Sequence, residues 1–253
     1  MRLTLVRHAT LVVEIAGRRL MVDPMLDAAN ARGPVRGTPN ELANPLVELP
    51  VPASEAVAGV EAVLLTHTHV DHLDAAGVTA VPPGVPWLCQ PEDMADLQPV
   101  GLQVMPVPEG APVTWEGLTV WRTGGEHGRT EEVIRGLAPV SGFVVAADGE
   151  PTLYVAGDTV WCDPVAHAIA THDPDVIVVN AGAATFLAGG TVTMEAGDVR
   201  AVAEAAPRAQ VVAVHMEAIN HCVETREQLA AAMADAGIDG RVAIPADGDV
   251  LTY

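Results

Sequence analysis

The sequence of 253 residues predicts a mixed α/β fold, because short apolar runs alternate with segments that carry helix-capping residues. The runs at 61–66, 175–179 and 209–214 are each followed by polar residues, as expected of buried strands that end at the edge of a sheet. Thr225 with Gln228 fits a capping box at the start of a helix. We therefore expect the polar side chains that follow these strands to be held in place by a rigid sheet.

The start of the chain predicts a small antiparallel sheet. Its strands are expected at 3–7, 11–16 and 19–23. Gly17-Arg18 fits a tight hairpin turn with glycine first. The sheet should end at Asp23-Pro24, because proline cannot continue a strand ladder. An aspartate in this position is commonly a turn residue.

A long loop is predicted for residues 25–52, because this stretch is rich in proline and glycine and its apolar residues show no sustained period. The loop is a candidate lid or substrate-contacting segment, and Arg32 and Arg36 are candidate anion contacts. If it is a lid, shortening it should impair turnover and leave melting nearly unchanged. The alternative is an ordered but inert connection.

The remaining elements are expected from apolar runs, turn residues and caps. Strands are expected near 87–89, 102–107, 118–123, 142–147, 151–156, 175–179 and 209–214, and helices at about 91–97, from Thr193 to about 206, and from Thr225 to about 234. Asp148-Gly149 between two of these strands is a hairpin signal.

Four side chains that can bind a metal lie within six positions of the string THTHVDHLD, directly after the apolar run 61–66. They are His67, His69, Asp71 and His72. Alternate residues of a loop can point the same way, so the first two histidines could bind one ion and the Asp71/His72 pair a second. Imidazole and carboxylate suit zinc, manganese or iron, and the absence of cysteine argues against a closed structural zinc site. The alternative is a group of surface histidines beside a solvated aspartate.

The string HTHVDH resembles the motif of the metallo-β-lactamase superfamily of metal-dependent hydrolases. Matching positions follow in order: His127 in TGGEHGR, Asp158 in LYVAGDT and His215 in VVAVHM. The opening RHATLVVEIAGRRLMVDP, which contains His8, is similar to the ascorbate-6-phosphate lactonase-like branch and, more distantly, to the N-acyl-phosphatidylethanolamine phospholipase D-like proteins.

This resemblance implies a four-layer αββα sandwich of two pseudo-repeated halves, in one domain that spans 1–253. It also implies two divalent ions, of which zinc is favoured over manganese or iron. One ion would take His67, His69 and His127, the other Asp71, His72 and His215, and Asp158 would bridge them. Asp23 would hydrogen-bond a ligand histidine, and His8 and Asn180 would lie near the ligands or the substrate. Asp158 could instead cap the following helix.

The resemblance further implies hydrolysis by a metal-bridging hydroxide, with a small, anionic metabolite such as a lactone or phosphoester as substrate. The leaving group needs a proton, for which Asp71 and His221 are the candidate catalytic residues. We expect His215 to be the ligand and His221 to face the substrate. Alternatives are a phosphodiesterase or phospholipase D-like enzyme, a di-iron redox protein and a non-catalytic scaffold; His69 and the chain length count against the redox protein.

Composition narrows the partners of the protein. The net charge is −20, and all 13 basic residues are arginine, so no basic track for nucleic acid is expected. No apolar run approaches the roughly 18 residues of a membrane span, and no signal peptide is evident. Three widely spaced cysteines suggest reduced thiols and hence the cytoplasm. The sequence is compatible with a homo-oligomer and does not determine the oligomeric state.

Overall fold

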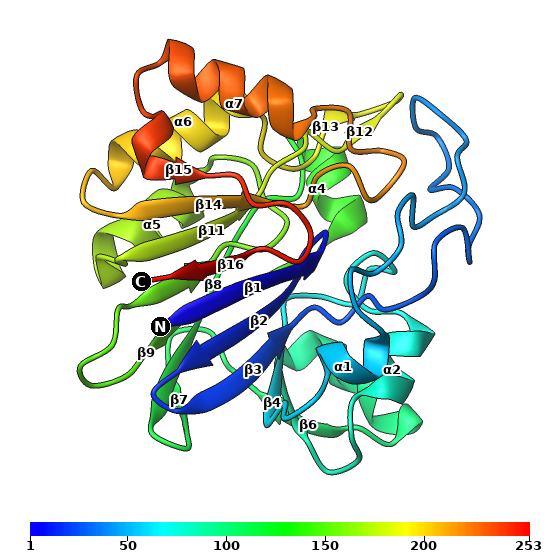
Figure 1. The fold of residues 1–253 in the computed structure, drawn as a ribbon, viewed down its shortest axis with the longest axis vertical. Helices are drawn as coiled ribbons and strands as arrows, with labels where there is room; N and C mark the ends of the chain where they lie inside the picture. Colours follow the sequence, from blue (N-terminus) through cyan, green and yellow to red (C-terminus); the bar gives the residue numbers. More distant parts are fainter.

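The computed structural model describes residues 1–253 as an αββα sandwich (Figure 1). Two seven-stranded sheets pack face to face, with strand orders β16-β1-β2-β3-β4-β5-β6 and β15-β14-β11-β10-β9-β8-β7, and a separate hairpin pairs β12 with β13. Helices α5, α6 and α7 cover one outer face, and α1, α2 and α3 cover the other. None of the helices is long and apolar enough to cross a membrane.

The elements have the following bounds. The first sheet contains β1 (Arg2–Arg7), β2 (Thr10–Ile15), β3 (Arg18–Val22), β4 (Ala62–Leu65), β5 (Pro86–Cys89), β6 (Gln103–Pro106) and β16 (Val250–Thr252). The second contains β7 (Val113–Trp115), β8 (Leu118–Thr123), β9 (Gly142–Ala146), β10 (Leu153–Val155), β11 (Val176–Asn180), β14 (Gln210–Val214) and β15 (Val242–Ala243). The hairpin is β12 (Thr185–Phe186) with β13 (Gly190–Thr191), and the helices are α1 (Ala53–Ala56), α2 (Ala75–Ala80), α3 (Met94–Leu97), α4 (Glu131–Leu137), α5 (Asp163–His172), α6 (Ala196–Ala205) and α7 (Arg226–Asp235).

Strand β4 shows why its sequence is apolar throughout. Leu64 belongs to the apolar layer between the two sheets, whereas Val63 and Leu65 belong to the layer under the first sheet's helices. Successive side chains of a strand point to opposite faces, so a strand covered on both faces reads as a continuous apolar run. Burial on both faces fixes the position of the loop that follows β4.

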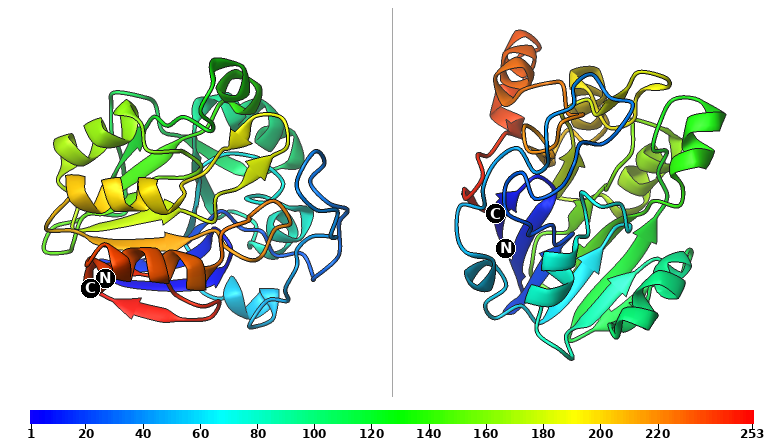
Figure 2. Two further views of the ribbon diagram at one scale, coloured as in Figure 1. Left: turned by 90° about the horizontal axis from the view of Figure 1, so that it is seen from above. Right: turned by 90° about the vertical axis from the view of Figure 1, so that its right-hand side faces the viewer.

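Several strands end at the same edge of the sandwich. β3, β4 and β5 are parallel neighbours, and so are β10, β11 and β14. The carboxyl ends of parallel strands meet at one edge, so the segments after β4, β10, β11 and β14 lie close together. Figure 2 shows the two sheets and the loops at this edge from two further directions.

The predicted elements agree with the structure for most strands and for the capping box of α7, in which Thr225 and Gln228 cap each other's backbone. Two predictions were wrong in detail. The first hairpin turns at Ala16-Gly17, not Gly17-Arg18, since Ile15 pairs with Arg18 and both turn residues have positive φ, a geometry in which alanine is unexpected. The N-cap of α6 is Glu195 rather than Thr193.

Thr193 does not cap α6 because its hydroxyl is used elsewhere. The buried Oγ1 accepts the Ala184 N–H at 2.9 Å and donates to the Ala181 carbonyl at 3.1 Å. The residue therefore fixes the loop between β11 and β12. Strand β7 and the short helices α1, α2 and α4 were not anticipated from the sequence, and residues 91–97 form a 3₁₀ turn followed by the single turn α3.

Candidate metal centre

The loop after β4 is held rigidly by its own side chains and by its neighbours. The backbone N–H groups of His72 and Leu73 both donate to the His69 carbonyl, at 2.8 and 2.9 Å. Asp74 caps α2 by accepting the Gly77 N–H at 2.7 Å, and it accepts the Asp27 N–H at 2.8 Å. The loop thus presents His67, His69, Asp71 and His72, four side chains that could bind a metal, from a fixed backbone.

Asp158 lies at the centre of four histidines, in the turn that follows β10. Its Oδ2 lies 3.4 Å from His127 Nε2 and 4.0 Å from His67 Nε2. Its Oδ1 lies 3.2 Å from His72 Nε2 and 3.5 Å from His215 Nε2. Each carboxylate oxygen therefore faces a different pair of imidazoles, and Asp158 does not cap α5, whose N-cap is Cys162.

The other ring nitrogen of each histidine is occupied, which sets the direction of the ring. Nδ1 of His67 lies 3.0 Å from the Thr66 hydroxyl, and Nδ1 of His127 lies 2.9 Å from the Val192 carbonyl. Nδ1 of His215 lies 3.6 Å from Cys222 Sγ. A histidine anchored through Nδ1 offers Nε2 to a metal.

The Nε2 atoms fit a bound cation. Those of His67, His72 and His215 are buried and have no hydrogen-bond partner. Buried polar atoms without partners are rare and need an explanation, of which an ion is one. The candidate ligand atoms form three overlapping groups, each within 4.8 Å: His67/His69/His127, His67/His72/Asp158 and His8/Asp71/His72/His215. His and Asp donors without thiolate suit a catalytic rather than a structural ion.

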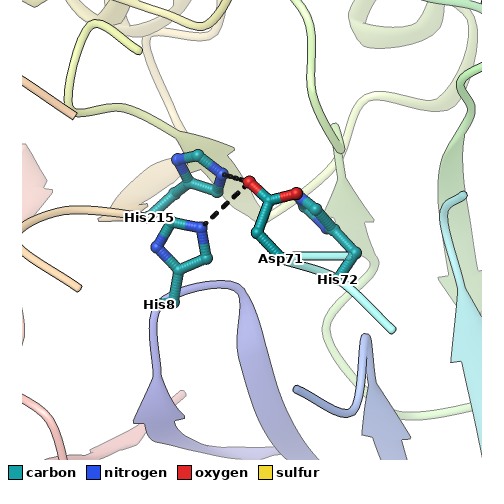
Figure 3. A group of neighbouring side chains, drawn as sticks. All are labelled: His8, Asp71, His72 and His215. Atoms are coloured by element: carbon teal, nitrogen blue, oxygen red, sulfur yellow. Dashed lines mark ion pairs between the residues drawn. The ribbon is translucent and has the colours of Figure 1, made fainter. Parts of the chain in front are cut away.

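Asp71 is surrounded by three imidazoles. Its Oδ2 lies 3.7 Å from His8 Nε2, 3.8 Å from His215 Nε2 and 3.7 Å from His221 Nε2. Figure 3 shows His8 and His215 on the same side of this carboxylate, with His72 behind it. The ring centroids of His8 and His215 are 3.6 Å apart, and the two ring planes are tilted by 36°. His221 is also buried and lies on the loop after β14.

The buried carboxylates attract positive charge to this cluster. Burial lowers the pKa of His72, but Asp158 and Asp23 outweigh it and raise the pKa to about 10. Burial raises the pKa of Asp158, but His215 and His72 hold it well below the usual range. A divalent cation would take the place of the proton on His72, because a ligand nitrogen must be neutral. His221 differs, since burial lowers its pKa to about 4.

Asp23 and Asn180 support the central residues. Asp23 Oδ2 lies 2.7 Å from His72 Nδ1, and the same carboxylate accepts the Thr66 N–H at 2.8 Å and the Thr66 hydroxyl at 2.7 Å. Asp23 also has a left-handed φ of 44°, so it is a turn residue as well as a histidine partner. Asn180 Nδ2 donates to Asp158 Oδ1 at 2.7 Å.

Replacing Asp23 with asparagine is expected to weaken both the fold and metal binding. The amide cannot accept at Oδ1 and Oδ2 together, so a buried partner is left unpaired, at a cost of about 3 kcal/mol in the free energy of unfolding. Loss of a histidine's partner typically lowers metal affinity by roughly 10- to 100-fold. Denaturation of the metal-free protein and a chelator-competition titration measure the two effects. Asp249→Asn, in a surface turn, is the control; unchanged metal affinity in Asp23→Asn would contradict the assigned role.

The segment 25–52 is held to the rest of the protein by hydrogen bonds from buried side chains. A lid that opens freely would have few such contacts. Arg7 is fully buried in β1, and its guanidinium donates to the carbonyls of Met25 at 3.1 Å, Asp27 at 2.8 Å and Val47 at 3.0 Å. Arg32 pairs with Asp27 at 3.2 Å and donates to the Val70 carbonyl in the segment 66–74 after β4, which we call the metal loop. One guanidinium nitrogen of Arg32, Nη2, is buried and has no hydrogen-bond partner, so the prediction that Arg32 contacts an anion stays a prediction.

Asn220, directly before His221 in the sequence, holds the middle of the segment. Its Oδ1 accepts from Val35 N at 3.0 Å and Asn44 Nδ2 at 2.7 Å, and its Nδ2 donates to Thr38 Oγ1 at 2.8 Å and to the Asn40 carbonyl at 2.9 Å. Its backbone N–H donates to Asn44 Oδ1 at 2.9 Å. Arg36 lies in this stretch, is exposed and forms no ion pair.

Three supporting residues were missed by the sequence analysis. They are Arg7, Asn220 and Cys222. A charged residue inside the apolar run of β1 was a signal for Arg7, because a buried guanidinium must find acceptors. Nothing in the sequence distinguishes Asn220 or Cys222. The partners of Asn220 are distant in the chain, and the contact of Cys222 with His215 depends on how the loop after β14 turns.

Replacing Asn220 with alanine is expected to release the segment 25–52. Trypsin should then cleave after Arg36 at least about tenfold faster than in the wild type, because cleavage follows the population of the opened segment. Mass spectrometry of the fragments measures this. Val202→Ala, at a fully buried position of α6, is the control for general destabilisation. Equal cleavage in both variants would contradict the anchoring role. Because Arg7 and Asn220 hold the segment 25–52 by hydrogen bonds, shortening it should lower the melting temperature, in contrast to the nearly unchanged melting expected from the sequence.

The fold and the histidine–aspartate cluster define a metal-dependent hydrolase of the metallo-β-lactamase type. The family model described as "Beta-lactamase superfamily domain" matches residues 18–216, and the chain belongs to this family. The UPF0173 protein YddR of Bacillus subtilis is 37% identical over 255 residues, covering 100% of both chains.

Two solved structures are similar over the whole chain. The isothiocyanate hydrolase from Delia radicum gut bacteria has a TM-score of 0.93 at 36% identity and covers 100% of this chain and 99% of its own. A possible metal-dependent hydrolase from Veillonella parvula has a TM-score of 0.95 at 29% identity, with the same coverage. Both neighbours carry the αββα arrangement described above.

Proposed function

We propose that the protein is a dinuclear metal hydrolase of small molecules, with zinc the favoured ion and manganese or iron as alternatives. The observation that carries this proposal is Asp158, whose two oxygens face separate histidine pairs. His67, His69 and His127 would hold one ion, Asp71, His72 and His215 the other, and Asp158 both. When bound, two such ions activate a water and polarise the bond under attack.

The chain's own residues would orient the reacting groups. The Asp23–His72 and Asn180–Asp158 contacts fix the directions of two central side chains, so little reorganisation is needed during reaction. His221 lies 3.7 Å from Asp71 and would move a proton to or from the leaving group, with Asp71 as the alternative.

One relative and the pairing of two arginines support a proposal for the substrate class. The isothiocyanate hydrolase is 36% identical over the full chain, which favours an isothiocyanate, R–N=C=S, as the first substrate class. Water would add to the central carbon, and both its hydrogens would end on nitrogen, giving the amine R–NH₂ and carbonyl sulfide. A lactone is the second candidate. A phosphoester is the weaker one, because Arg32 pairs with Asp27 and Arg129 with Asp198.

An activity screen tests this proposal. Chelated protein should be reconstituted separately with zinc, manganese and iron, and assayed on allyl isothiocyanate, a γ-lactone and bis(p-nitrophenyl) phosphate. We expect metal-dependent release of amine from the isothiocyanate and loss of the activity on chelation. Turnover that survives complete metal removal would contradict a metal hydrolase. If only the lactone or only the phosphodiester is turned over with metal, that compound's class would replace isothiocyanates as the proposed substrate.

A further inference from the structure

We propose that the groove between α4 and the hairpin β12–β13 binds the uncharged, apolar arm of the substrate. The inference rests on the proposed function, because it assigns a place to the part of the substrate that does not react. The groove has a volume of about 470 Å³. In Figure 1 its two walls lie side by side at the same edge of the sandwich as the metal loop.

The walls of the groove are built from the two segments that support His127. Helix α4 starts four residues after this histidine. The hairpin leads directly into Val192, whose carbonyl lies 2.9 Å from His127 Nδ1. The groove is therefore tied to one side of the ligand cluster.

Phe186 joins the groove to the reacting site. Its half-buried side chain lines the groove, and its ring centroid lies 5.9 Å from that of His221. The neighbouring Thr185 N–H donates to the His221 carbonyl at 2.9 Å, which fixes the hairpin against this histidine. Since His221 Nε2 lies 3.7 Å from Asp71, the path from the ligands to the groove runs over His221 and Phe186.

Two glycines fix the shape of the groove around Val133. A Cβ added to Gly128 would lie 2.6 Å from Val133 Cγ1, and one added to Gly189 would lie 2.8 Å from Val133 Cγ2. Real Cβ atoms do not approach so closely, so a side chain at either position would force Val133, the loop before α4 or the hairpin to shift. The groove is consequently preformed, as small-molecule subsites usually are.

The lining of the groove selects the chemistry of its occupant. Val133, Leu137, Phe186 and Ala188 give an apolar surface, and the only charged side chain is the exposed Glu132. A carboxylate repels an anionic group, and no arginine or histidine lines the groove to receive one. An alkyl or aryl arm attached to a neutral electrophile fits both the apolar walls and the charge.

A series of metal-binding inhibitors tests the proposal without knowledge of the substrate. Acetohydroxamate, butyrohydroxamate and hexanohydroxamate share one metal-binding head and differ in the length of the apolar arm. Calorimetry on the zinc-loaded protein should show affinity rising about fourfold for each methylene that enters the groove. The arm is the only variable, so the gain reports the groove.

Gly136→Leu is the variant that should remove this gain. Gly136 lines the groove, and nothing lies within 4 Å of a Cβ added there, so the leucine side chain can fill the groove without disturbing α4. Gly197→Leu makes the same change in α6, where a Cβ also meets nothing within 4 Å, and should keep the gain. Acetohydroxamate should bind equally to the wild type and both variants.

Each outcome bears on one of the two proposals. A flat series in the wild type, with acetohydroxamate bound, would overturn the groove assignment and leave the metal centre standing. A gain that persists in Gly136→Leu would also overturn it, because the arm would then lie elsewhere. Failure of zinc-loaded protein to bind any of the hydroxamates would count against the proposed function, and the subsite would fall with it.

Discussion

Asp158→Asn is expected to release both metal ions and to lower kcat/KM by about three orders of magnitude, or roughly 4 kcal/mol of transition-state stabilisation. The variant keeps the shape of the side chain and its contact with Asn180, so the fold should survive. It removes the negative charge that faces four histidine Nε2 atoms within 4.0 Å. Metal analysis after dialysis and steady-state kinetics measure the two effects.

The comparison of variants shows whether Asp158 serves both ions. His127→Ala should weaken one ion only, because His127 contacts one oxygen of Asp158. Asp148→Asn, in the exposed turn between β9 and β10, should change neither metal content nor turnover. An Asp158→Asn protein that holds as much metal as the wild type would show that the carboxylate does not bridge.

His215→Ala and His221→Ala are expected to differ in kind. His215 Nε2 lies 3.5 Å from Asp158 and 3.8 Å from Asp71, so its loss should cost one ion and nearly all activity. His221 Nε2 lies 3.7 Å from Asp71, but the residue belongs to none of the three ligand groups, and its ring centroid lies 5.9 Å from that of Phe186. His221→Ala should therefore retain both ions and lose turnover by about 100-fold, the usual contribution of a proton-transfer group.

The same two variants can also contradict the roles assigned to His215 and His221. If His221→Ala loses an ion and His215→Ala retains both, the roles of the two histidines are reversed. Cys222→Ser serves as a related control, because the thiol lies 3.6 Å from His215 Nδ1 and the smaller hydroxyl can still act as a partner. It should leave the metal content of the protein unchanged.

The cluster of ligand-type residues was predictable because its chemistry is local in the sequence. His67, His69, Asp71 and His72 fall in one short string after an apolar run, and the string carries a family resemblance that places His127, Asp158 and His215. The structure brings all seven together in the groups described above. The αββα layers followed from the same resemblance, since apolar periodicity alone indicates only mixed α and β.

The supporting contacts were less predictable because they join distant parts of the chain. Asn220 contacts Asn44 and Thr38, which are 176 and 182 residues away, and no local pattern marks such a pair. His8 has a left-handed φ of 60° after β1, which places its ring against His215. The Asn220 contacts and the His8–His215 contact depend on how the folded chain brings distant segments together. The spacing of residues in the sequence does not show which distant segments meet.

The errors in the predicted elements have local physical causes. The first hairpin is shifted by one residue because Ala16 adopts a positive φ that is unusual for alanine. Thr193 is a strong capping type, but its hydroxyl is drawn into the loop after β11. In each case a tertiary contact or the register of the strands overrides the local preference.

The number of ions bound per chain tests the central claim most directly. The protein should be stripped with chelator, reconstituted with excess zinc, freed of unbound metal, and analysed by mass spectrometry of the metal against protein concentration from amino-acid analysis. The two ligand groups that meet at Asp158 predict close to two ions per chain, falling to about one in His127→Ala. At most one ion in the fully reconstituted wild type would contradict the dinuclear centre.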